Sequence, residues 1–489
     1  MLHHLDRAHV ESAVRAVTAA ELLSPEEGAR PVPLGAGAGT SSAMAPATPT
    51  ALVGDGPREG VASIDERFAR AAWSSLVEPG DVTAGTIVGE FGADRSLSML
   101  LERRTPDEWV GACSAEARAD LPLADVAAAL ERWKPRLASK TVLTALRAAA
   151  HHRAQLVVPG DPAWPEGLAD LGPHAPLALW VRGDPTCLGG SGDSVALVGS
   201  RDATSYGEHV AMDLAAGLSD RGFSIVSGAA YGIDGMAHRA ALASSGTTIA
   251  YLAGGVDRLY PSGHGDLLRR IIAVGAVVSE LPCGAAPTRW RFLQRNRLIA
   301  ATSVATVVVE AGHRSGSLNT AGHAAALGRA LGAVPGPVTS VNSAGCHRLL
   351  REYDAVCVTS AAEVAELALG SLNLEPSLLD GLVGEPERPP ASGVPSPGAP
   401  PTGRAPRGSA PAPAATSAAT ASVGAGVPSR PSLAAAPTRV HDALSKRAAR
   451  DVADLARRSG LGLREVEAAL GALSLEGTAR EISSGWLRS

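Results

Sequence analysis

Short apolar runs without polar alternation recur between residues 194 and 358, and amphipathic stretches separate them. The runs read SVALVGS, SIVSGAA, TTIAYLAGG, AVVSE, ATVVVEA and ALGAVPG, and residues 206–221 and 317–329 are typical of the helical stretches between them. Strands that are apolar on both faces lie inside a parallel sheet, and the intervening helices cover its two faces. The pattern therefore predicts an α/β fold with a doubly wound, Rossmann-like parallel sheet, which we assign to residues 151–370.

The N-terminal third of the chain predicts two different segments. Residues 1–60 are rich in Gly, Ala, Pro and Thr after a short helical start, so we expect a poorly ordered extension. Residues 61–150 instead place Phe68, Ala71, Ala72 and Leu76 at helical spacing, and further helical stretches follow. A small helical domain is therefore expected to precede the sheet.

The C-terminal part predicts a tether and a second ordered domain. Thirteen of the 35 prolines fall within residues 385–437, so we expect residues 371–437 to form a Pro/Ala-rich linker. Residues 438–489 read as helix, helix, a turn at Gly460, helix and two short strands, which is the order of a winged helix. The helix after this turn, which would be the DNA-reading helix of a helix-turn-helix, carries two Glu and one Arg in LREVEAALGAL. Phosphates would repel this face, so protein contacts are favoured at least as much as DNA.

Composition and charge exclude several classes of protein. The 489 residues carry a formal charge of −5, which argues against a uniformly basic nucleic-acid coat but leaves room for a local patch. Five scattered cysteines include no C-x-x-C pair, which argues against a zinc ribbon, a thioredoxin-like site and a disulfide scaffold. We expect neither a metal nor a cofactor. The chain shows neither a signal-peptide pattern nor about 18 successive apolar residues. We therefore expect a cytoplasmic protein without a membrane span.

Glycine- and serine-rich loops follow four of the predicted strands, at residues 199–201, 227–234, 253–255 and 310–317. Glycine lets backbone N–H groups approach a phosphate, and the helix that follows adds partial positive charge. Tight turns explain any one such loop, but four at one sheet edge predict a phosphate-binding rim. The G-x-G-x-x-G, Walker A, G-x-S-x-G and H-E-x-x-H patterns are all missing from the sequence.

Arginines gather next to this predicted rim. Eight lie between Leu281 and Arg351, where Glu310 is the only acid, and four of them surround Trp290 and Phe292. Guanidinium groups bind phosphate oxygens, and aromatic planes stack on unpaired bases. A solvated basic helix face is the alternative, but the position of the run beside the rim favours a ligand.

Together these residues resemble the DNA-processing protein A family, also called DprA or Smf. The resemblance is carried by VALVGSRDATSYG, SGAAYGIDGMAH, AGGVDRLYP, SELP, QRNRLIA, VVVEAGHRSGSLNTAGHAAALGRALGAVPG and SAGCHRLL, over roughly 165 residues in family order. Residues 61–150 also look like the family's helical appendage, which is SAM-like or helix-hairpin-helix-like, and residues 438–489 look like its winged helix.

The resemblance implies a single-stranded DNA-binding recombination mediator without catalytic turnover. Such a protein protects incoming DNA in natural transformation of competent cells, helps to load a RecA-type recombinase, displaces single-strand-binding protein and acts as a homodimer. Family motifs assign DNA and phosphate binding to Gly199, Ser200, Arg201, Gly228, Tyr231, Gly232, Arg295, Asn296, Arg297, Ser315, Gly316 and Ser317. Tyr231 stands where members often have Lys or Arg, and Leu293 where many have Pro.

Two other functions remain open from the residues. A nucleotide phosphoribohydrolase-like enzyme could share the sheet, but its P-G-G-x-G-T-x-x-E loop is replaced here by EAGHRSGSLNT. Asp234 and Glu310 are the only obvious acids near the rim, and Asp234 also fits a helix cap. A protein-interaction scaffold built on the linker and the winged helix is compatible with DNA binding.

Overall fold

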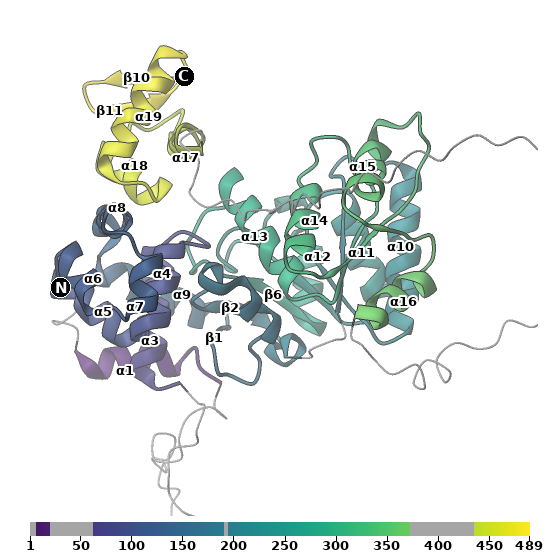
Figure 1. The fold of residues 1–489 in the computed structure, drawn as a ribbon, viewed down its shortest axis with the longest axis horizontal. Helices are drawn as coiled ribbons and strands as arrows, with labels where there is room; N and C mark the ends of the chain where they lie inside the picture. The colour runs from purple at the N-terminus through teal and green to yellow at the C-terminus, as the bar shows by residue number, and fades with distance from the viewer. Residues whose placement is uncertain (1–5, 20–61, 190–193, 372–434) are drawn as a thin grey trace, which may run out of the picture. The chain divides into compact units, whose positions relative to one another are not determined.

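The computed structural model describes residues 6–19, 62–189, 194–371 and 435–489. Its centre is a nine-stranded sheet with the strand order β1-β2-β6-β5-β4-β3-β7-β8-β9 (Figure 1). The predicted linker, apart from its two ends, and most of the predicted N-terminal extension lie outside the described residues.

Seven neighbouring strands of this sheet are parallel, and the first six along the chain lie in the six apolar runs that predict them, whereas β9 lies in none of these runs. They are β3 (Ser194–Val198), β4 (Ser224–Ser227), β5 (Thr248–Tyr251), β6 (Ala276–Ser279), β7 (Ala305–Val308), β8 (Ala330–Ala333) and β9 (Val356–Cys357). The chain runs outward from β3 to β6 and then returns to the other side of β3 with β7. The loops that follow β3 and β7 therefore diverge at a topological switch point.

Helices cover both faces of the sheet. On one face lie α10 (Ser205–Asp220), α11 (Ile233–Ala243), α12 (Gly265–Val274) and α16 (Ala361–Ser371). On the other lie α13 (Arg289–Ala301), α14 (Ser317–Ala326) and α15 (Ala344–Glu352). Successive strand side chains point to opposite faces, so Val195 and Leu197 of β3 pack with α10 while Ala196 and Val198 join the α13 side. The predicted doubly wound fold is confirmed.

Two further strands extend the sheet beyond what the sequence predicts. β1 (Ala154–Val157) and β2 (Leu179–Gly183) come from a segment in which short apolar runs alternate with Pro and Gly. β2 pairs antiparallel with β6, and β1 pairs antiparallel with β2. The segment therefore continues the sheet through backbone hydrogen bonds.

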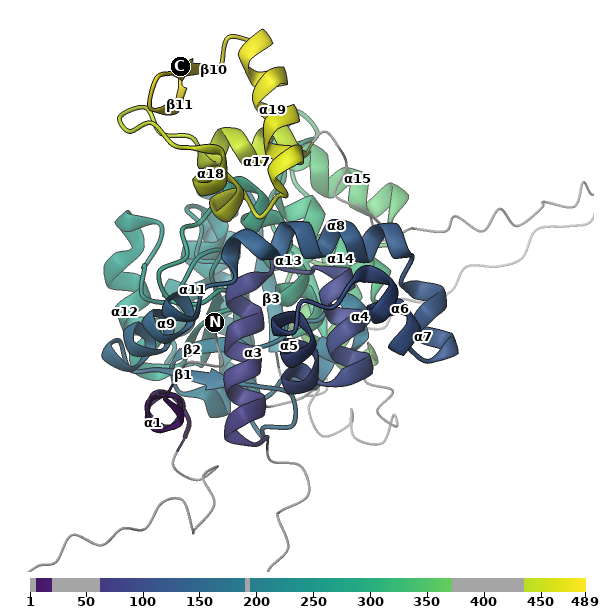
Figure 2. The ribbon, with the colours of Figure 1, turned by 90° about the vertical axis from the view of Figure 1, so that its left-hand side faces the viewer.

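A helical region adjoins this end of the sheet, as Figure 2 shows. It contains α3 (Ile64–Leu76), α4 (Val82–Phe91), α5 (Ala93–Leu101), α6 (Pro106–Ala112), α7 (Ala115–Asp120), α8 (Leu123–Trp133) and α9 (Ser139–His151). Trp73 and Trp133 are buried in its core with ring centroids 5.1 Å apart. The short helix α1 (Arg7–Arg15) buries Val14 in the same core, and the Val17 carbonyl accepts a hydrogen bond from the Leu156 N–H of β1 (2.7 Å).

Residues 435–489, which we call the C-terminal module, have a small core of their own. The module consists of α17 (Ala435–Ala443), α18 (Val452–Ser459), α19 (Leu463–Leu475) and the hairpin of β10 (Ala479–Ile482) and β11 (Gly485–Arg488). Gly460 ends α18 with φ +69°, in the left-handed region that glycine favours. This is the element order that the sequence predicts for a winged helix. None of the helices in the described ranges is long and apolar enough to cross a bilayer.

Candidate nucleic-acid interface

Three of the predicted loops meet at the switch point between β3 and β7. Gly199, Ser200 and Arg201 directly follow β3, and the loop after β7 begins near Glu310. The Ser200 N–H donates to the Glu310 carbonyl (2.7 Å), and the Ser200 carbonyl accepts from the Ile233 N–H (3.2 Å), where α11 begins after the β4 loop. These backbone bonds join the loops after β3, β4 and β7 into one continuous rim, where open α/β sheets bind ligands.

The rim glycines allow the loops to approach one another closely. Gly232 has φ +73°, and a Cβ there would lie 2.3 Å from the Ser200 carbonyl oxygen. A Cβ on Gly228 would lie 2.3 Å from both terminal nitrogens of Arg295. Gly199 is similarly packed against the Ile233 side chain. Close packing between loops therefore accounts for these glycines, independently of any ligand.

The two acids near the rim bind backbone groups of its loops. The Asp234 carboxylate accepts from the Gly228 and Ala230 N–H groups (3.2 and 3.3 Å). The Glu310 carboxylate accepts from the Thr204 N–H (2.9 Å) and hydroxyl (2.6 Å). Burial raises the pKa of Asp234, although the neighbouring Arg295 opposes this shift. Both side chains shape the loops on which a ligand would rest.

The R-N-R segment of α13 lies inside the protein. Arg295, Asn296 and Arg297 are 6, 8 and 2% exposed. Arg295 donates to the carbonyls of Gly228 (2.9 Å) and Tyr251, and Arg297 donates to Glu280 (2.7 Å). Burial lowers the pKa of Arg295 to about 10, which leaves it charged at neutral pH. In this geometry the two arginines stabilise the rim loops from the protein interior, and their buried guanidinium groups are not accessible to a phosphate.

The loop before α14 carries Ser315 and Ser317, whose side chains contact each other. The Ser315 and Ser317 hydroxyls lie 2.7 Å apart, and the Ser317 N–H points to the Ser315 oxygen at 3.4 Å. Asn296 donates to the carbonyl of Gly316 (3.2 Å), which connects this loop to α13. Gly316 is exposed whereas Ser317 is buried. The predicted S-G-S residues therefore lie together at the start of α14, on the side of the rim next to α13.

The exposed side of the rim carries an Arg and three aromatic side chains, which we call the aromatic platform: Arg201, Tyr231, Tyr260 and Phe292. The Arg201 guanidinium carbon lies 5.1 Å from the Phe292 ring centroid, and the Phe292 and Tyr260 rings are 5.7 Å apart. Tyr231 and Tyr260 are each 48% exposed, and the Tyr231 hydroxyl accepts from the Gly263 N–H (3.3 Å). Among the described residues, Arg201 forms no ion pair.

Only part of the platform could be found from the sequence. Arg201 and Tyr231 are predicted site residues, and Phe292 stands in the arginine run, but Tyr260 was missed. The available signal is its place in AGGVDRLYP, the segment that follows β5. Leu293, which departs from the family pattern, is 42% exposed directly after Phe292.

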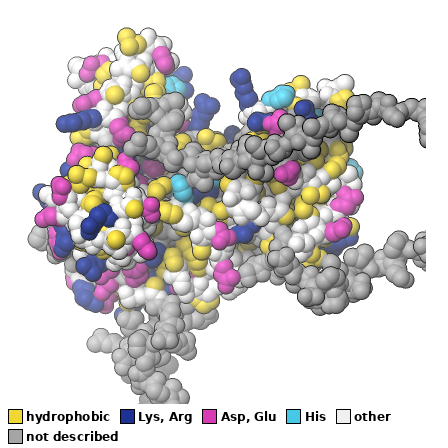
Figure 3. All heavy atoms as spheres, viewed as in Figure 1, with side chains coloured by type: hydrophobic (Ala, Val, Ile, Leu, Met, Phe, Trp, Pro, Cys, Tyr) yellow, Lys and Arg dark blue, Asp and Glu magenta, His cyan; other side chains and the backbone are white. Residues whose placement is uncertain are grey.

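On one face of the molecule, surface charge does not by itself mark a binding site. On the face shown in Figure 3, the basic and acidic side chains of the described residues are interspersed instead of forming a field of one sign. This agrees with the formal charge of −5. Recognition at the rim would therefore depend on the few groups gathered there.

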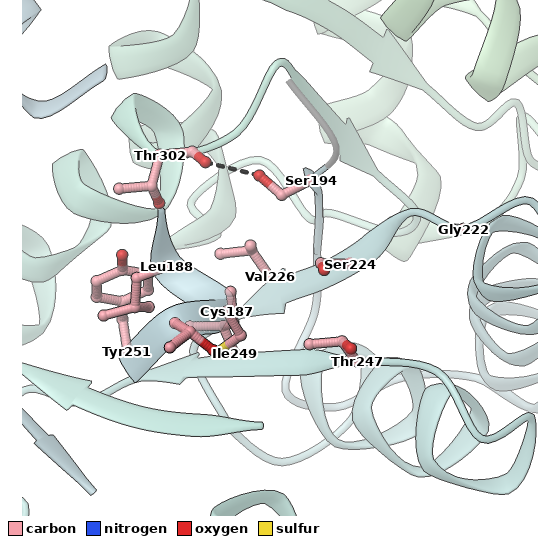
Figure 4. A pocket seen from close by; sticks show the side chains of 11 residues that line it. Cys187, Leu188, Ser194, Gly222, Ser224, Val226, Thr247, Ile249, Tyr251 and Thr302 are labelled. Carbon is pink, nitrogen blue, oxygen red and sulfur yellow. Dashed lines mark hydrogen bonds between the residues drawn. The ribbon is translucent and has the colours of Figure 1, made fainter. Parts of the chain in front are cut away.

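A cavity of about 190 Å³ lies at the opposite sheet edge, where the strands begin (Figure 4). Cys187, Tyr251 and Thr302 line it, and the Ser194 hydroxyl donates to the Thr302 carbonyl at its wall (2.7 Å). Burial raises the pKa of the Cys187 thiol to about 12, so the thiol is protonated at neutral pH. No Lys or Arg is among the residues that line the cavity, so it does not fit an anionic ligand.

Comparison with known proteins shows which family the chain resembles. The family model for DNA recombination-mediator protein A matches residues 155–368, which include every rim loop. The DNA processing protein DprA of Bacillus subtilis is 33% identical over 237 residues, which are 48% of this chain and 77% of that protein. The DprA of Streptococcus pneumoniae is 38% identical over 204 residues, which are 42% of this chain and 71% of that protein.

The chain belongs to the DprA/Smf family. A putative DprA of Mycobacterium tuberculosis is 53% identical over 222 residues, but the match spans only 57% of that relative and 43% of this chain. The X-ray structure of S. pneumoniae DprA is similar with a TM-score of 0.48 and 28% identity, over 62% of this chain and 97% of that one. The structure of a Helicobacter pylori DprA, which is described for its single-stranded DNA binding mode, is similar with a TM-score of 0.41 and 27% identity. The match covers 45% of this chain and 97% of that one.

The contact between Gly228 and Arg295 predicts the effect of one added methyl group. In Gly228→Ala, the new Cβ forces the buried guanidinium away from its carbonyl partners, so we expect a loss of about 1–3 kcal/mol in the free energy of unfolding. Gly312→Ala is the matched control, because its Cβ would meet nothing closer than 3.7 Å. Urea unfolding measures both variants, and equal stability of the two would contradict the proposed close packing.

Proposed function

We propose that this protein binds single-stranded DNA at the rim and acts as a recombination mediator. The observation that carries the proposal is the aromatic platform: Arg201 stacks on Phe292 beside two half-exposed tyrosines, at the edge where α/β sheets bind ligands. Membership of the DprA/Smf family supports the same function.

The chemistry of the platform suits unpaired bases. A flat ring or a guanidinium plane can stack on the face of any base, so such a surface binds strands without reading their sequence. In a duplex these base faces are already stacked and are closed to side chains. Arg201, which has no ion-pair partner among the described residues, is also free to contact a backbone phosphate.

The same geometry argues against a hydrolytic role. A general acid or base must reach the reacting atom of its substrate. Asp234 and Glu310 instead accept hydrogen bonds from N–H and hydroxyl groups of the loops. The proposal is therefore binding without turnover, and the phosphoribohydrolase-like alternative gains no support from these acids.

The wider biological role follows from family membership and belongs to the proposal. It comprises protection of incoming DNA in natural transformation, displacement of single-strand-binding protein and loading of a RecA-type recombinase. We propose that the protein works in the cytoplasm as a homodimer.

A salt titration tests the binding mode. We expect the protein to bind a labelled single-stranded oligonucleotide more tightly than its duplex, with the logarithm of affinity falling by about 0.7 per neutralised phosphate for each tenfold rise in salt. Mononucleotides should compete poorly, because they contact only one position. Tight mononucleotide binding without strand binding, or release of a free base, would point to the enzyme alternative.

Paired substitutions test the platform itself. Phe292→Leu removes a stacking surface, so we expect binding to weaken by about 1–3 kcal/mol if one base stacks there. Arg201→Gln should weaken binding to all sequences alike and reduce the salt slope by about 0.7 if it contacts one phosphate. Fluorescence anisotropy across salt concentrations measures both effects.

The chain offers a matched control for these two variants. Arg348 lies over the Tyr353 ring at 5.6 Å in an exposed pair at the end of α15, outside the rim. Tyr353→Leu and Arg348→Gln remove the same kinds of group there and should leave strand affinity unchanged. Losses of equal size at both places would sink the proposed site.

Recombinase loading tests the mediator role. On a strand coated with single-strand-binding protein, the wild-type protein should shorten the lag before a RecA-type recombinase begins to hydrolyse ATP. Arg201→Gln should lengthen this lag again, whereas Arg348→Gln should behave as wild type. A lag that is the same with and without the wild-type protein would restrict the proposal to DNA binding.

A further inference from the structure

The C-terminal module packs against the first turn of α13, the helix that carries Phe292. The Asp442 carboxylate of α17 accepts a hydrogen bond from the Arg289 N–H (3.1 Å). The Arg439 guanidinium carbon, also on α17, lies 5.5 Å from the Trp290 ring centroid. The first four N–H groups of a helix lack partners within it, and a carboxylate there also interacts favourably with the helix dipole.

A buried ionic cluster of Glu78, Arg136 and Arg291 adjoins this turn. Glu78 of the helical region accepts from the Arg291 Nε (3.0 Å) and Nη2 (2.7 Å), and also from Arg136. Arg136 in turn donates to the Arg457 carbonyl of α18 (2.8 Å). Burial disfavours the charged form of Glu78, but the guanidinium groups of Arg291 and Arg136 hold its pKa well below the usual range. The carboxylate is therefore ionised and fixes Arg291 in place.

Gly460 allows the module to reach this cluster. A Cβ at this position would lie 2.3 Å from the Glu78 Cγ and 2.8 Å from terminal nitrogens of Arg136 and Arg439. The turn between α18 and α19 thus contacts the cluster through its backbone. A side chain here would force Glu78 and the two arginines to shift.

Three successive residues of α13 are therefore held by groups outside the parallel sheet and its covering helices. Arg289 is bound by Asp442, Trp290 by Arg439 and Arg291 by Glu78. The next residue is Phe292, the ring on which Arg201 stacks. From within the segment itself, Thr288 caps this turn, since its hydroxyl accepts from the Arg291 N–H (3.3 Å).

We propose that the C-terminal module is a positioning element for the strand-binding site. By docking at Gly460 and Asp442 it orders the first turn of α13 and so fixes the Phe292 ring in the aromatic platform. The inference rests on the proposed function, because its readout is strand affinity. Gly460 and Asp442 are positioning residues and touch no DNA themselves.

Gly460→Asn in the full chain tests this inference. Asn tolerates the left-handed conformation, so the substitution mainly adds bulk against Glu78. The control is Gly477→Asn, since Gly477 has φ +70° in the same module and no heavy atom within 4 Å of an added Cβ. Relative to this control, we expect faster hydrogen exchange in residues 289–292 and single-strand affinity about 2- to 30-fold weaker.

A double-mutant cycle separates positioning from general damage. If the module acts through Phe292, Gly460→Asn should have little further effect on affinity in a Phe292→Leu background. Asp442→Ala provides a second variant that leaves the turn after α18 intact, and it should reproduce both the exchange and the affinity changes. Thermal unfolding shows whether each variant remains folded.

The outcomes distinguish this inference from the proposed function. Wild-type protein that fails to bind single strands would overturn both. Wild-type binding together with unchanged or tighter binding by Gly460→Asn and Asp442→Ala would overturn the positioning role alone. Effects of Gly460→Asn and Phe292→Leu that simply add would likewise overturn it.

Discussion

The buried guanidinium group of Arg295 is the interaction on which the rim depends. It donates to the Gly228 carbonyl after β4 and to the Tyr251 carbonyl at the end of β5, and so connects α13 to the carboxyl ends of two strands. A buried charge is costly unless hydrogen bonds satisfy it. Both carbonyl groups must therefore stay within hydrogen-bond distance of Arg295, which fixes the positions of the two loops. The Phe292 ring centroid lies 5.9 Å from the guanidinium carbon of Arg295 and 5.1 Å from that of Arg201. The solvent-exposed aromatic platform thus depends on the buried charge of Arg295.

The parallel sheet could be predicted from the sequence because its strands are short runs of apolar residues on both faces. β3, β4 and β7 begin within one residue of the runs that predict them. The antiparallel pair β1 and β2 could not be predicted, since Pro and Gly interrupt their apolar residues and their partners are chosen by backbone hydrogen bonds. No local pattern in the sequence records such a pairing.

The arginines of α13 show where sequence reasoning about the site ends. Spacing and composition place Arg291, Arg295 and Arg297 beside the rim but do not tell which way each side chain points. Arg291 is paired with Glu78, which lies 213 positions away in the sequence, and Arg295 donates to carbonyl groups that no residue type reveals. Arg201, by contrast, directly follows a strand in a loop at the switch point, so its exposed position could be anticipated from topology.

The two outer edges of the sheet bear on how copies of the chain could associate. At one edge, the Val17 carbonyl after α1 already accepts the Leu156 N–H of β1. At the other edge β9 has only two residues, Val356 and Cys357, both exposed. An edge this short offers few unpaired backbone groups to an incoming strand. The two edges therefore leave few backbone groups for a second copy. The fold thus disfavours self-association by sheet extension, the usual route to fibrous aggregates.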